Sequence, residues 1–309
     1  PSYELNEIIC FWDGKDAGKL RSDIYPNYKI SRKIQRQNFT KEEKADYDNF
    51  LSQITRIQEY LPHLYIKTYS DDLVETDDMV AYYVQNKKEN EHVVIATSDI
   101  DLFQLLSEDV SIYNLRKKKL LTDLYPKHHL LKPSTFKEVY GYTHKNIALY
   151  KAICGDSDDI AGVGGIQLKG LISAFPEFKN HEYTLDRILK ETEQHKILRE
   201  EQKKKPLKKF LNIHENVELI KFNMKLVDLN ENLITEECIE NISNLIKLPL
   251  DIQSSDNFKQ ILLEDKIIEE VKIDIYYASI SEFFYPYKRY IDKKTGNKKI
   301  TRKTKINNK

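Results

Sequence analysis

The chain has 309 residues, and its 49 lysine and arginine residues balance its 49 aspartate and glutamate residues, so the formal net charge is zero. Hydrophobic residues make up 40% of the chain, which supports a substantial core in one large domain or two ordinary ones. The three cysteines have no paired spacing, and no apolar run approaches the roughly 18 residues of a membrane helix, so we expect no disulfide framework, zinc site or membrane partner.

Two apolar runs in the first third of the chain predict buried parallel strands. Residues 7–13 and 92–101 are rich in isoleucine, valine and aromatic residues, and each run ends in aspartate. A further strand pair is expected at 109–122, where a basic turn separates two apolar stretches. Helical spacing of apolar residues over 41–60 and 76–86 places helices between the first two strands. This order predicts an α/β fold, in which ligands bind at the carboxyl ends of the strands.

Acidic residues cluster at the ends of four separate segments. They are Asp13, Glu75, Asp77, Asp78, Asp99, Asp101, Asp156, Asp158 and Asp159. Bringing these carboxylates together is unfavourable unless a cation lies between them, and hard divalent ions with oxygen ligands provide that compensation. So many acids leave room for two ions about 4 Å apart, the arrangement that suits in-line displacement at phosphorus. Each cluster alone also fits a helix cap, a polar loop or a turn, and their joint order favours a metal site.

A glycine-rich turn follows the last acidic cluster. Gly162, Gly164 and Gly165 precede a helix expected to begin at about Gln167, and Lys169 adds a positive charge. Glycines let backbone N–H groups approach a phosphate, and a helix N-terminus favours its negative charge. The sequence lacks the Gly-Lys-Ser/Thr ending of a nucleoside-triphosphate loop, so the turn predicts a sequence-independent grip on a nucleic-acid backbone.

Basic residues are segregated from the acidic ones. They gather at 29–36, 203–209 and 288–309. Segregation of this kind indicates a polyanion partner beside an acidic site. We expect the basic tail at 288–309 to add non-specific affinity for nucleic acid that falls steeply with salt.

Five motifs occur in one order within residues 7–180. They are Trp12-Asp13-Gly14; Tyr25-Pro26-Asn27-Tyr28-Lys29 with Arg32; Glu75 with Asp77 and Asp78; Ser98-Asp99-Ile100-Asp101; and Gly155 through Lys169. In this order they resemble the 5′-nuclease, or flap endonuclease, superfamily, which includes phage 5′→3′ exonucleases and ribonuclease H enzymes and the 5′-nuclease domain of bacterial DNA polymerase I. The region after residue 210 is more similar to the phage ribonuclease H branch.

The resemblance implies a domain organisation. Residues 1–150 would form a PIN-like nuclease domain with a mainly parallel sheet and a helical arch at about 26–60. Residues 151–309 would hold a helix-turn-helix segment that binds duplex DNA, a helical C-terminal region and the basic tail. The family also has an earlier strand that ends in a metal-binding aspartate, so we expect a segment to precede residue 1.

The resemblance also implies roles for basic and aromatic residues. Lys29 matches the family's catalytic lysine, which contacts the scissile phosphate, and Arg32 would assist it. Tyr28 matches an aromatic residue on which a terminal base stacks, and Arg21 lies where the family has a nucleic-acid-binding arginine ahead of the arch. The residues that match the duplex-binding turn, commonly occupied by a K⁺ ion, are Gly162, Gly164, Gly165 and Lys169.

The acidic motif GDSDDI is one residue shorter than the family's usual pattern. Asp156 matches its first acid, and either Asp158 or Asp159 could fill the second position. Spacing favours Asp159, whereas alignment from the following isoleucine favours Asp158. The cofactor implied is a pair of Mg²⁺ ions, with Mn²⁺ as an alternative.

The function implied is a structure-specific 5′→3′ nuclease that removes primers and flaps during DNA replication. One ion, held by Glu75, Asp77 and neighbouring acids, would generate the attacking hydroxide. A second, nearer Asp101, Asp156 and Asp159, would stabilise the leaving oxygen. The expected substrates are DNA with 5′ flaps or ends and an RNA·DNA duplex. A single-stranded DNA-binding protein is a further expected partner of a monomeric enzyme in the cytoplasm, the host's cytoplasm if a phage encodes it.

Two alternatives belong to other functional classes. A catalytically impaired module, lacking the first metal-ligand strand, would bind branched DNA without cutting it. A metal-dependent phosphatase would act on small molecules, but the basic clusters and the glycine-rich turn disfavour it.

Overall fold

The structure, a computed structural model, describes residues 7–123, 133–205, 207–249, 255–269, 271–274 and 276–277. The chain divides into two compact units. Among the described residues, the larger unit comprises 11–52 and 69–249, and the smaller unit comprises 7–10, 53–68 and the residues from 255 onward. The domain boundary expected near residue 150 stays a prediction, and the expected basic tail at 288–309 lies outside the described residues.

The larger unit contains a four-stranded sheet in the order β3-β4-β5-β6. Its strands are β3 (Val93–Thr97), β4 (Val110–Asn114), β5 (Lys119–Thr122) and β6 (Ser134–Thr135). β3 and β4 are parallel, with Val93 opposite Val110, whereas β4 and β5 are antiparallel and β5 and β6 are again parallel. The strands expected at 92–101 and 109–122 and the mixed α/β fold are therefore confirmed.

Two further strands, β1 (Ile9–Asp13) and β2 (Lys67–Asp71), form a separate two-stranded sheet. No side chain of β1 is buried, and Val94 of β3 is 52% exposed although its neighbour Ile95 is buried. The strand expected at 7–13 is therefore confirmed as β1, but the expectation that both apolar runs form buried strands is wrong. The reason is that, among the described residues, β1 and β3 lie at sheet edges and lack a neighbouring strand on one side.

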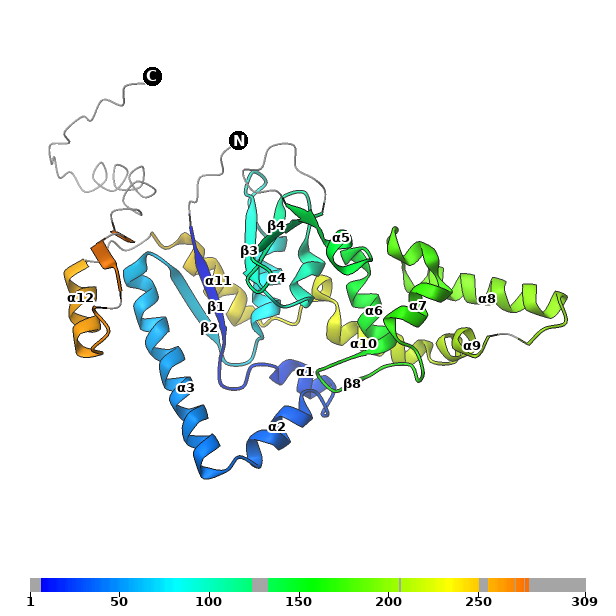
Figure 1. The fold of residues 1–309 in the computed structure, drawn as a ribbon, viewed down its shortest axis with the longest axis horizontal. Coiled ribbons are helices and arrows are strands. Elements are labelled where there is room, and N and C mark those ends of the chain that lie inside the picture. Colours follow the sequence, from blue (N-terminus) through cyan, green and yellow to red (C-terminus); the bar gives the residue numbers. More distant parts are fainter. Residues whose placement is uncertain are drawn as a thin grey trace, which may run out of the picture. The chain divides into compact units, whose positions relative to one another are not determined.

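Helices make up most of the rest of the larger unit (Figure 1). They are α1 (Lys19–Ile24), α2 (Ile30–Gln37), α4 (Thr76–Gln85), α5 (Phe136–Tyr140), α6 (Ile147–Cys154), α7 (Leu168–Ala174), α8 (Leu185–Glu201), α9 (Lys208–Glu215), α10 (Val217–Val227) and α11 (Glu236–Lys247). Short 3-10 turns are η2 (Asp101–Leu105), η3 (His144–Asn146), η4 (Pro176–Lys179) and η5 (Leu229–Glu231). α4 confirms the helix expected at 76–86.

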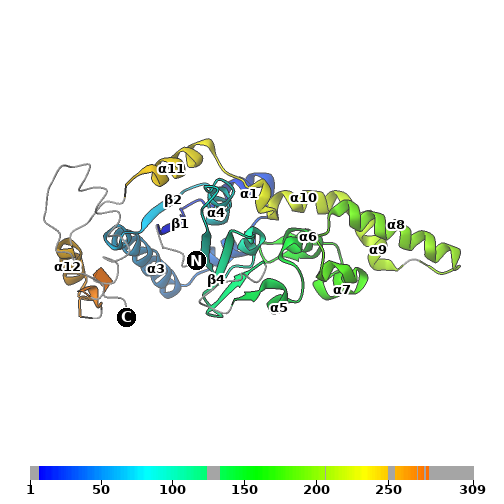
Figure 2. The ribbon, with the colours of Figure 1, turned by 90° about the horizontal axis from the view of Figure 1, so that it is seen from above.

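α6 runs through the core of the larger unit. Ile147 and Ile153 have no exposed surface, because the helix is apolar on nearly all sides. α10 lies alongside α6 (Figure 2), and the side chain of Asn223 donates hydrogen bonds of 2.9 Å to the carbonyls of Ala152 and Ala161. α6 therefore gives a firm base to the acidic hairpin that follows it.

A short hairpin and the glycine-rich turn follow α6. The hairpin pairs β7 (Gly155–Asp156) with β8 (Ile160–Ala161) in antiparallel fashion. α7 then begins at Leu168 with Gln167 as its N-cap, as the sequence predicted. Further along, α8 and α9 lie side by side (Figure 2). The helix-turn-helix function of this region stays a prediction.

α2 leads into α3 (Lys41–Tyr60), which confirms the helix expected at 41–60. Neither helix contains a buried side chain. The role of residues 26–60 as an arch stays a prediction. From residue 53 onward α3 belongs to the smaller unit.

The smaller unit contains η1 (Leu61–Leu64) and α12 (Ser255–Glu264). Phe258, Leu262 and Ile273 form its buried cluster. Asp265 accepts a hydrogen bond of 2.7 Å from Nε of Arg56 and ties α12 to the end of α3. Across the described parts of the chain, no helix combines the length and the apolarity that crossing a membrane would need.

Candidate active site

Carboxylates from three segments line a small cavity of about 20 Å³ in the larger unit. The acidic residues that line it are Glu75, Asp77, Asp101, Asp156 and Asp158. They come from the start of α4, from the turn after β3 and from the β7–β8 hairpin. The structure thus brings most of the predicted acids together, at the carboxyl end of β3, where α/β folds bind ligands.

Glu75 is surrounded by basic and hydroxyl groups. Its carboxylate lies 2.6 Å from Nη1 of Arg21, pairs with the ammonium of Lys29 and accepts a hydrogen bond of 3.0 Å from the hydroxyl of Tyr28. Burial raises the pKa of Glu75, but the charges of Arg21 and Lys29 more than offset this effect and hold the pKa below its usual value. Glu75 is therefore ionised at neutral pH.

Arg21 is an interior residue with only 5% of its surface exposed. Its guanidinium pairs with Asp78, and Nε donates a hydrogen bond of 2.9 Å to the carbonyl of Leu226. Asp78 also accepts a hydrogen bond of 2.9 Å from the backbone N–H of Leu233. In the structure Arg21 joins α1, α4 and the end of α10. The contact with nucleic acid expected for Arg21 stays a prediction.

Tyr28 is likewise buried, with 5% of its surface exposed. The ammonium of Lys29 lies 5.1 Å from the centroid of its ring. Stacking of a terminal base on Tyr28 stays a prediction, and the ring would have to be uncovered first.

The two adjacent aspartates of the hairpin point to different partners. Asp158 lies 2.5 Å from Nη2 of Arg32, 3.6 Å from Nζ of Lys29 and within hydrogen-bonding distance of the Tyr28 hydroxyl. Asp159 instead accepts hydrogen bonds from the backbone N–H and the hydroxyl of Ser31. Asp158 therefore lies in the acidic cluster with Lys29 and Arg32, and Asp159 does not line the cavity.

Asp13 and Asp99 also lie outside the lining of the cavity. Asp13 accepts hydrogen bonds of 2.7 Å and 2.8 Å from the backbone N–H and the hydroxyl of Thr76, so it caps the start of α4. Asp99 is exposed and accepts a hydrogen bond of 3.0 Å from the backbone N–H of Asp101. Their roles as metal ligands stay predictions.

Lys151 was not among the residues singled out from the sequence. It forms an ion pair with Asp101 and lies 2.9 Å from Oδ2 of Asp156. Burial lowers its pKa, but these two carboxylates raise it further, so the net pKa is above the usual value. A signal was present in the sequence, because Lys151 is the one charged residue in the apolar stretch 147–154. A lone charge in such a helix points to a buried partner.

Asp77 is the carboxyl of the cavity whose negative charge would be least compensated by neighbouring cations. Burial is the largest cause that raises its pKa, and repulsion from Asp99 and Asp101 adds to it, so the pKa of Asp77 is about 8. Burial also raises the pKa of Asp101 to about 6. A cation between these oxygens would relieve the repulsion.

The five acidic side chains that line the cavity are suited to a hard divalent ion, because they offer carboxylate oxygens as ligands. Among the described residues no group of three or more acidic, histidine or cysteine side chains is already arranged to hold a metal ion. Lys29 and Lys151 occupy part of the space between the carboxylates. Metal binding would therefore require these ammonium groups to move away from the oxygens.

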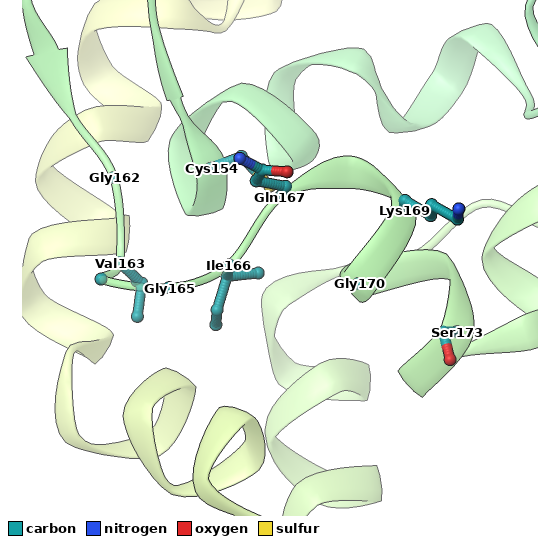
Figure 3. Close-up of a pocket in the computed structure, with 10 residues that line it drawn as sticks. Cys154, Gly162, Val163, Gly165, Ile166, Gln167, Lys169, Gly170 and Ser173 are labelled. Carbon is teal, nitrogen blue, oxygen red and sulfur yellow. The ribbon is translucent and has the colours of Figure 1, made fainter.

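The glycine-rich turn lines a second cavity of about 700 Å³ (Figure 3). Gly162 is packed so tightly that a Cβ atom would lie 2.1 Å from the carbonyl carbon of Cys154, whereas Gly164 and Gly165 face open space. Lys169 is exposed. The cavity thus presents backbone and a positive charge to solvent, as a contact with phosphate requires.

Residues 2–141 match the family model described as "5′-3′ exonuclease, N-terminal resolvase-like domain". Among characterised relatives, a 5′-3′ exonuclease of Buchnera aphidicola subsp. Schizaphis graminum is 28% identical over 183 residues, which cover 58% of this chain and 55% of that protein. A thermostable DNA polymerase I of Thermus thermophilus is 30% identical over 161 residues, 52% of this chain and 17% of that protein. The chain thus spans about half the length of the first relative.

Solved structures of a phage T5 protein are similar over most of the chain. The T5 5′-exonuclease with bound zinc has a TM-score of 0.59 and 25% identity, covering 85% of both chains. The T5 D15 flap endonuclease in a pseudo-enzyme-product complex with DNA and metal ions has a TM-score of 0.57 and 25% identity, again covering 85% of both chains.

Proposed function

We propose that the chain is a member of the 5′-nuclease superfamily and acts as a metal-dependent 5′→3′ exonuclease and flap endonuclease that hydrolyses phosphodiester bonds. The observation that carries the proposal is the meeting of Lys29 and Arg32 with the carboxylates of Glu75 and Asp158 at one cavity. Cations beside clustered acids are what a phosphate group and divalent ions need together.

The cofactor we propose is Mg²⁺, replaceable by Mn²⁺, and two ions fit the number of acids. The residues that would hold it are Glu75, Asp77, Asp101, Asp156 and Asp158. When bound, such ions lower the pKa of an attacking water and stabilise the leaving oxygen. A K⁺ ion at the glycine-rich turn remains a further proposal.

Lys29 would contact the scissile phosphate. Its side chain is 23% exposed beside the carboxylates of Glu75 and Asp158. Burial lowers the pKa of Lys29, but these two carboxylates raise it further, so Lys29 stays protonated. A protonated lysine stabilises the negative charge that grows on the phosphate oxygens in the transition state. Arg32, whose side chain is 52% exposed, would hold the neighbouring phosphate.

The substrates we propose are DNA with 5′ flaps or ends and RNA·DNA duplexes, as in primer removal during replication. The exposed backbone of Gly164 and Gly165 and the side chain of Lys169 would contact the duplex away from the cut. A single-stranded DNA-binding protein as partner also remains a proposal.

Cleavage of a labelled 5′-flap DNA and of a 5′-labelled RNA·DNA duplex tests the proposal. We expect products with Mg²⁺ or Mn²⁺, none with a chelator, and loss of activity in Asp101→Asn, which serves as the control for contaminating nuclease. Tight flap binding without cleavage in any metal would favour a branched-DNA-binding module instead. If the chain neither bound nor cleaved these substrates, both functions would be refuted.

A further inference from the structure

α2 is attached to the larger unit by polar contacts. No side chain of α2 is buried and only Ile30 is partly buried, so hydrophobic packing contributes little to its position. The β7–β8 hairpin provides contacts at its N-terminal end: Asp158 meets Lys29 and Arg32, and Asp159 meets Ser31. The hairpin and α2 lie more than a hundred residues apart in the sequence, with 128 positions separating Ser31 from Asp159.

Asp159 caps α2 from outside the helix. The N-cap position of α2 is Lys29, which has a φ of 52° and provides no side-chain cap. The first N–H groups of a helix need acceptors. Oδ2 of Asp159 accepts from the N–H of Ser31 at 2.8 Å, and Oδ1 accepts from the Ser31 hydroxyl at 2.5 Å. The negative charge of this carboxylate also interacts favourably with the positive, N-terminal end of the helix dipole.

The backbone geometry couples this cap to Lys29. Asp159 has a φ of 64°, a left-handed conformation that aspartate and asparagine tolerate better than most residues. Its neighbour Asp158 accepts a hydrogen bond of 3.0 Å at its carbonyl from the backbone N–H of Lys29. The Tyr25 hydroxyl donates a hydrogen bond of 3.2 Å to the carbonyl of Asp159. The hairpin therefore holds the turn before α2 on both sides of Lys29.

We propose that Asp159 is a positioning residue that docks the N-terminus of α2 on the hairpin and thereby sets Lys29 at the acidic cavity. This inference rests on the proposed nuclease function, in which Lys29 contacts the phosphate. Adjacent aspartates then have separate tasks: Asp158 belongs to the acidic cluster, and Asp159 orients the helix. Both carboxylate oxygens of Asp159 are engaged by Ser31, which leaves it poorly placed to bind a metal ion.

Three variants test the inference. Asp159→Gly keeps the left-handed backbone but removes the cap, Asp159→Asn keeps both the backbone and an acceptor, and Ser31→Ala removes only the hydroxyl. Hydrogen–deuterium exchange of residues 30–37 in the metal-free chain reports docking without any need for catalysis. We expect exchange about fivefold faster in Asp159→Gly, a smaller increase in Ser31→Ala, and almost no change in Asp159→Asn.

Single-turnover cleavage of a 5′-flap DNA under saturating enzyme then reports the position of Lys29. We expect Asp159→Gly to slow cleavage about tenfold to a hundredfold, with flap affinity changed much less, and Asp159→Asn to stay within about threefold of the unaltered chain. In a Lys29→Ala background the further loss from Asp159→Gly should largely vanish, because both changes remove the same contact.

A different pattern would overturn the inference. If Asp159→Asn abolished cleavage and weakened Mg²⁺ binding while exchange of α2 stayed unchanged, Asp159 would be a metal ligand. Unchanged exchange in Asp159→Gly would equally refute the docking role. If no chain cleaved DNA but α2 still lost protection only in Asp159→Gly and Ser31→Ala, docking would stand and the nuclease proposal would fail by itself.

Discussion

Lys151 on α6 forms an ion pair with Asp101 at the start of η2, and the same ammonium lies 2.9 Å from Asp156 on the hairpin. One largely buried cation therefore neutralises acids from two segments that meet only in the folded chain. A divalent ion in the cavity would compete with it for the same oxygens. This relationship makes the stability of the protein depend on what occupies the space between the acids.

Replacing Lys151 by methionine should destabilise the metal-free chain. The change leaves two largely buried carboxylates without their partner, and we expect a loss of roughly 2–4 kcal/mol in the free energy of unfolding. Thermal melting with chelator and with Mg²⁺ measures this, and Mg²⁺ should raise the melting temperature more in the variant than in the unaltered chain. Lys145→Met is the matched control, because Lys145 is 49% exposed beside Glu182. Equal effects of the two changes would contradict the interpretation.

Asp77 should make the metal-free chain less stable as the pH rises. Its pKa is raised from 3.8 to about 8, so the folded state binds more protons than the unfolded state between these values. The contribution of the protonated form is complete below about pH 4 and is lost as the pH rises toward 8. Asp77→Asn should therefore be more stable than the unaltered chain at pH 8 and should show a flatter profile over this range.

Denaturant unfolding at pH 5, 6, 7 and 8 in the presence of chelator measures the Asp77 effect. Asp46→Asn on the exposed surface of α3 is the control, and its profile should follow that of the unaltered chain. If the pH profile of Asp77→Asn instead followed that of the unaltered chain, the carboxyl of Asp77 would be ionised in the folded state over this range.

Arg21 should matter more for stability than for contact with DNA. Arg21→Ala leaves Asp78 and Glu75 buried without their guanidinium, and we expect a loss of about 3–5 kcal/mol in the free energy of unfolding. Arg36→Ala, at an exposed position of α2, should change stability by less than about 0.5 kcal/mol. A well-folded Arg21→Ala chain with unchanged melting but weaker flap binding would instead support the nucleic-acid contact expected from the sequence.

The glycines of the turn should differ sharply in their tolerance of alanine. In Gly162→Ala the new Cβ would meet the backbone of Cys154 at 2.1 Å, so the turn must shift, and we expect a loss of about 3 kcal/mol or more. In Gly164→Ala the added Cβ atom would have no neighbouring atom within 4 Å, so this variant should melt like the unaltered chain. Thermal melting separates the two, and a filter-binding measurement on Gly164→Ala then shows whether the added methyl group weakens duplex binding without disturbing the fold.

The sequence by itself determined several of the elements and indicated a family resemblance. Apolar runs at 92–101 and 109–122 and helical spacing at 41–60 and 76–86 each specify a local conformation, because strand and helix periodicities are carried by near neighbours. The order of the acidic and glycine motifs was sufficient to indicate the 5′-nuclease superfamily. None of these inferences required knowledge of which segments pack together.

Only the tertiary structure decided which side chains share an environment. Asp158 and Asp159 are adjacent in the sequence, yet one faces Lys29 and Arg32 and the other caps α2 through Ser31, at positions more than a hundred residues away. Arg21 is basic and near the predicted arch, but α10 and α4 bury it. Partners at such separations are chosen by how the helices pack on one another. The spacing of residues along the chain therefore does not predict which distant side chains become partners.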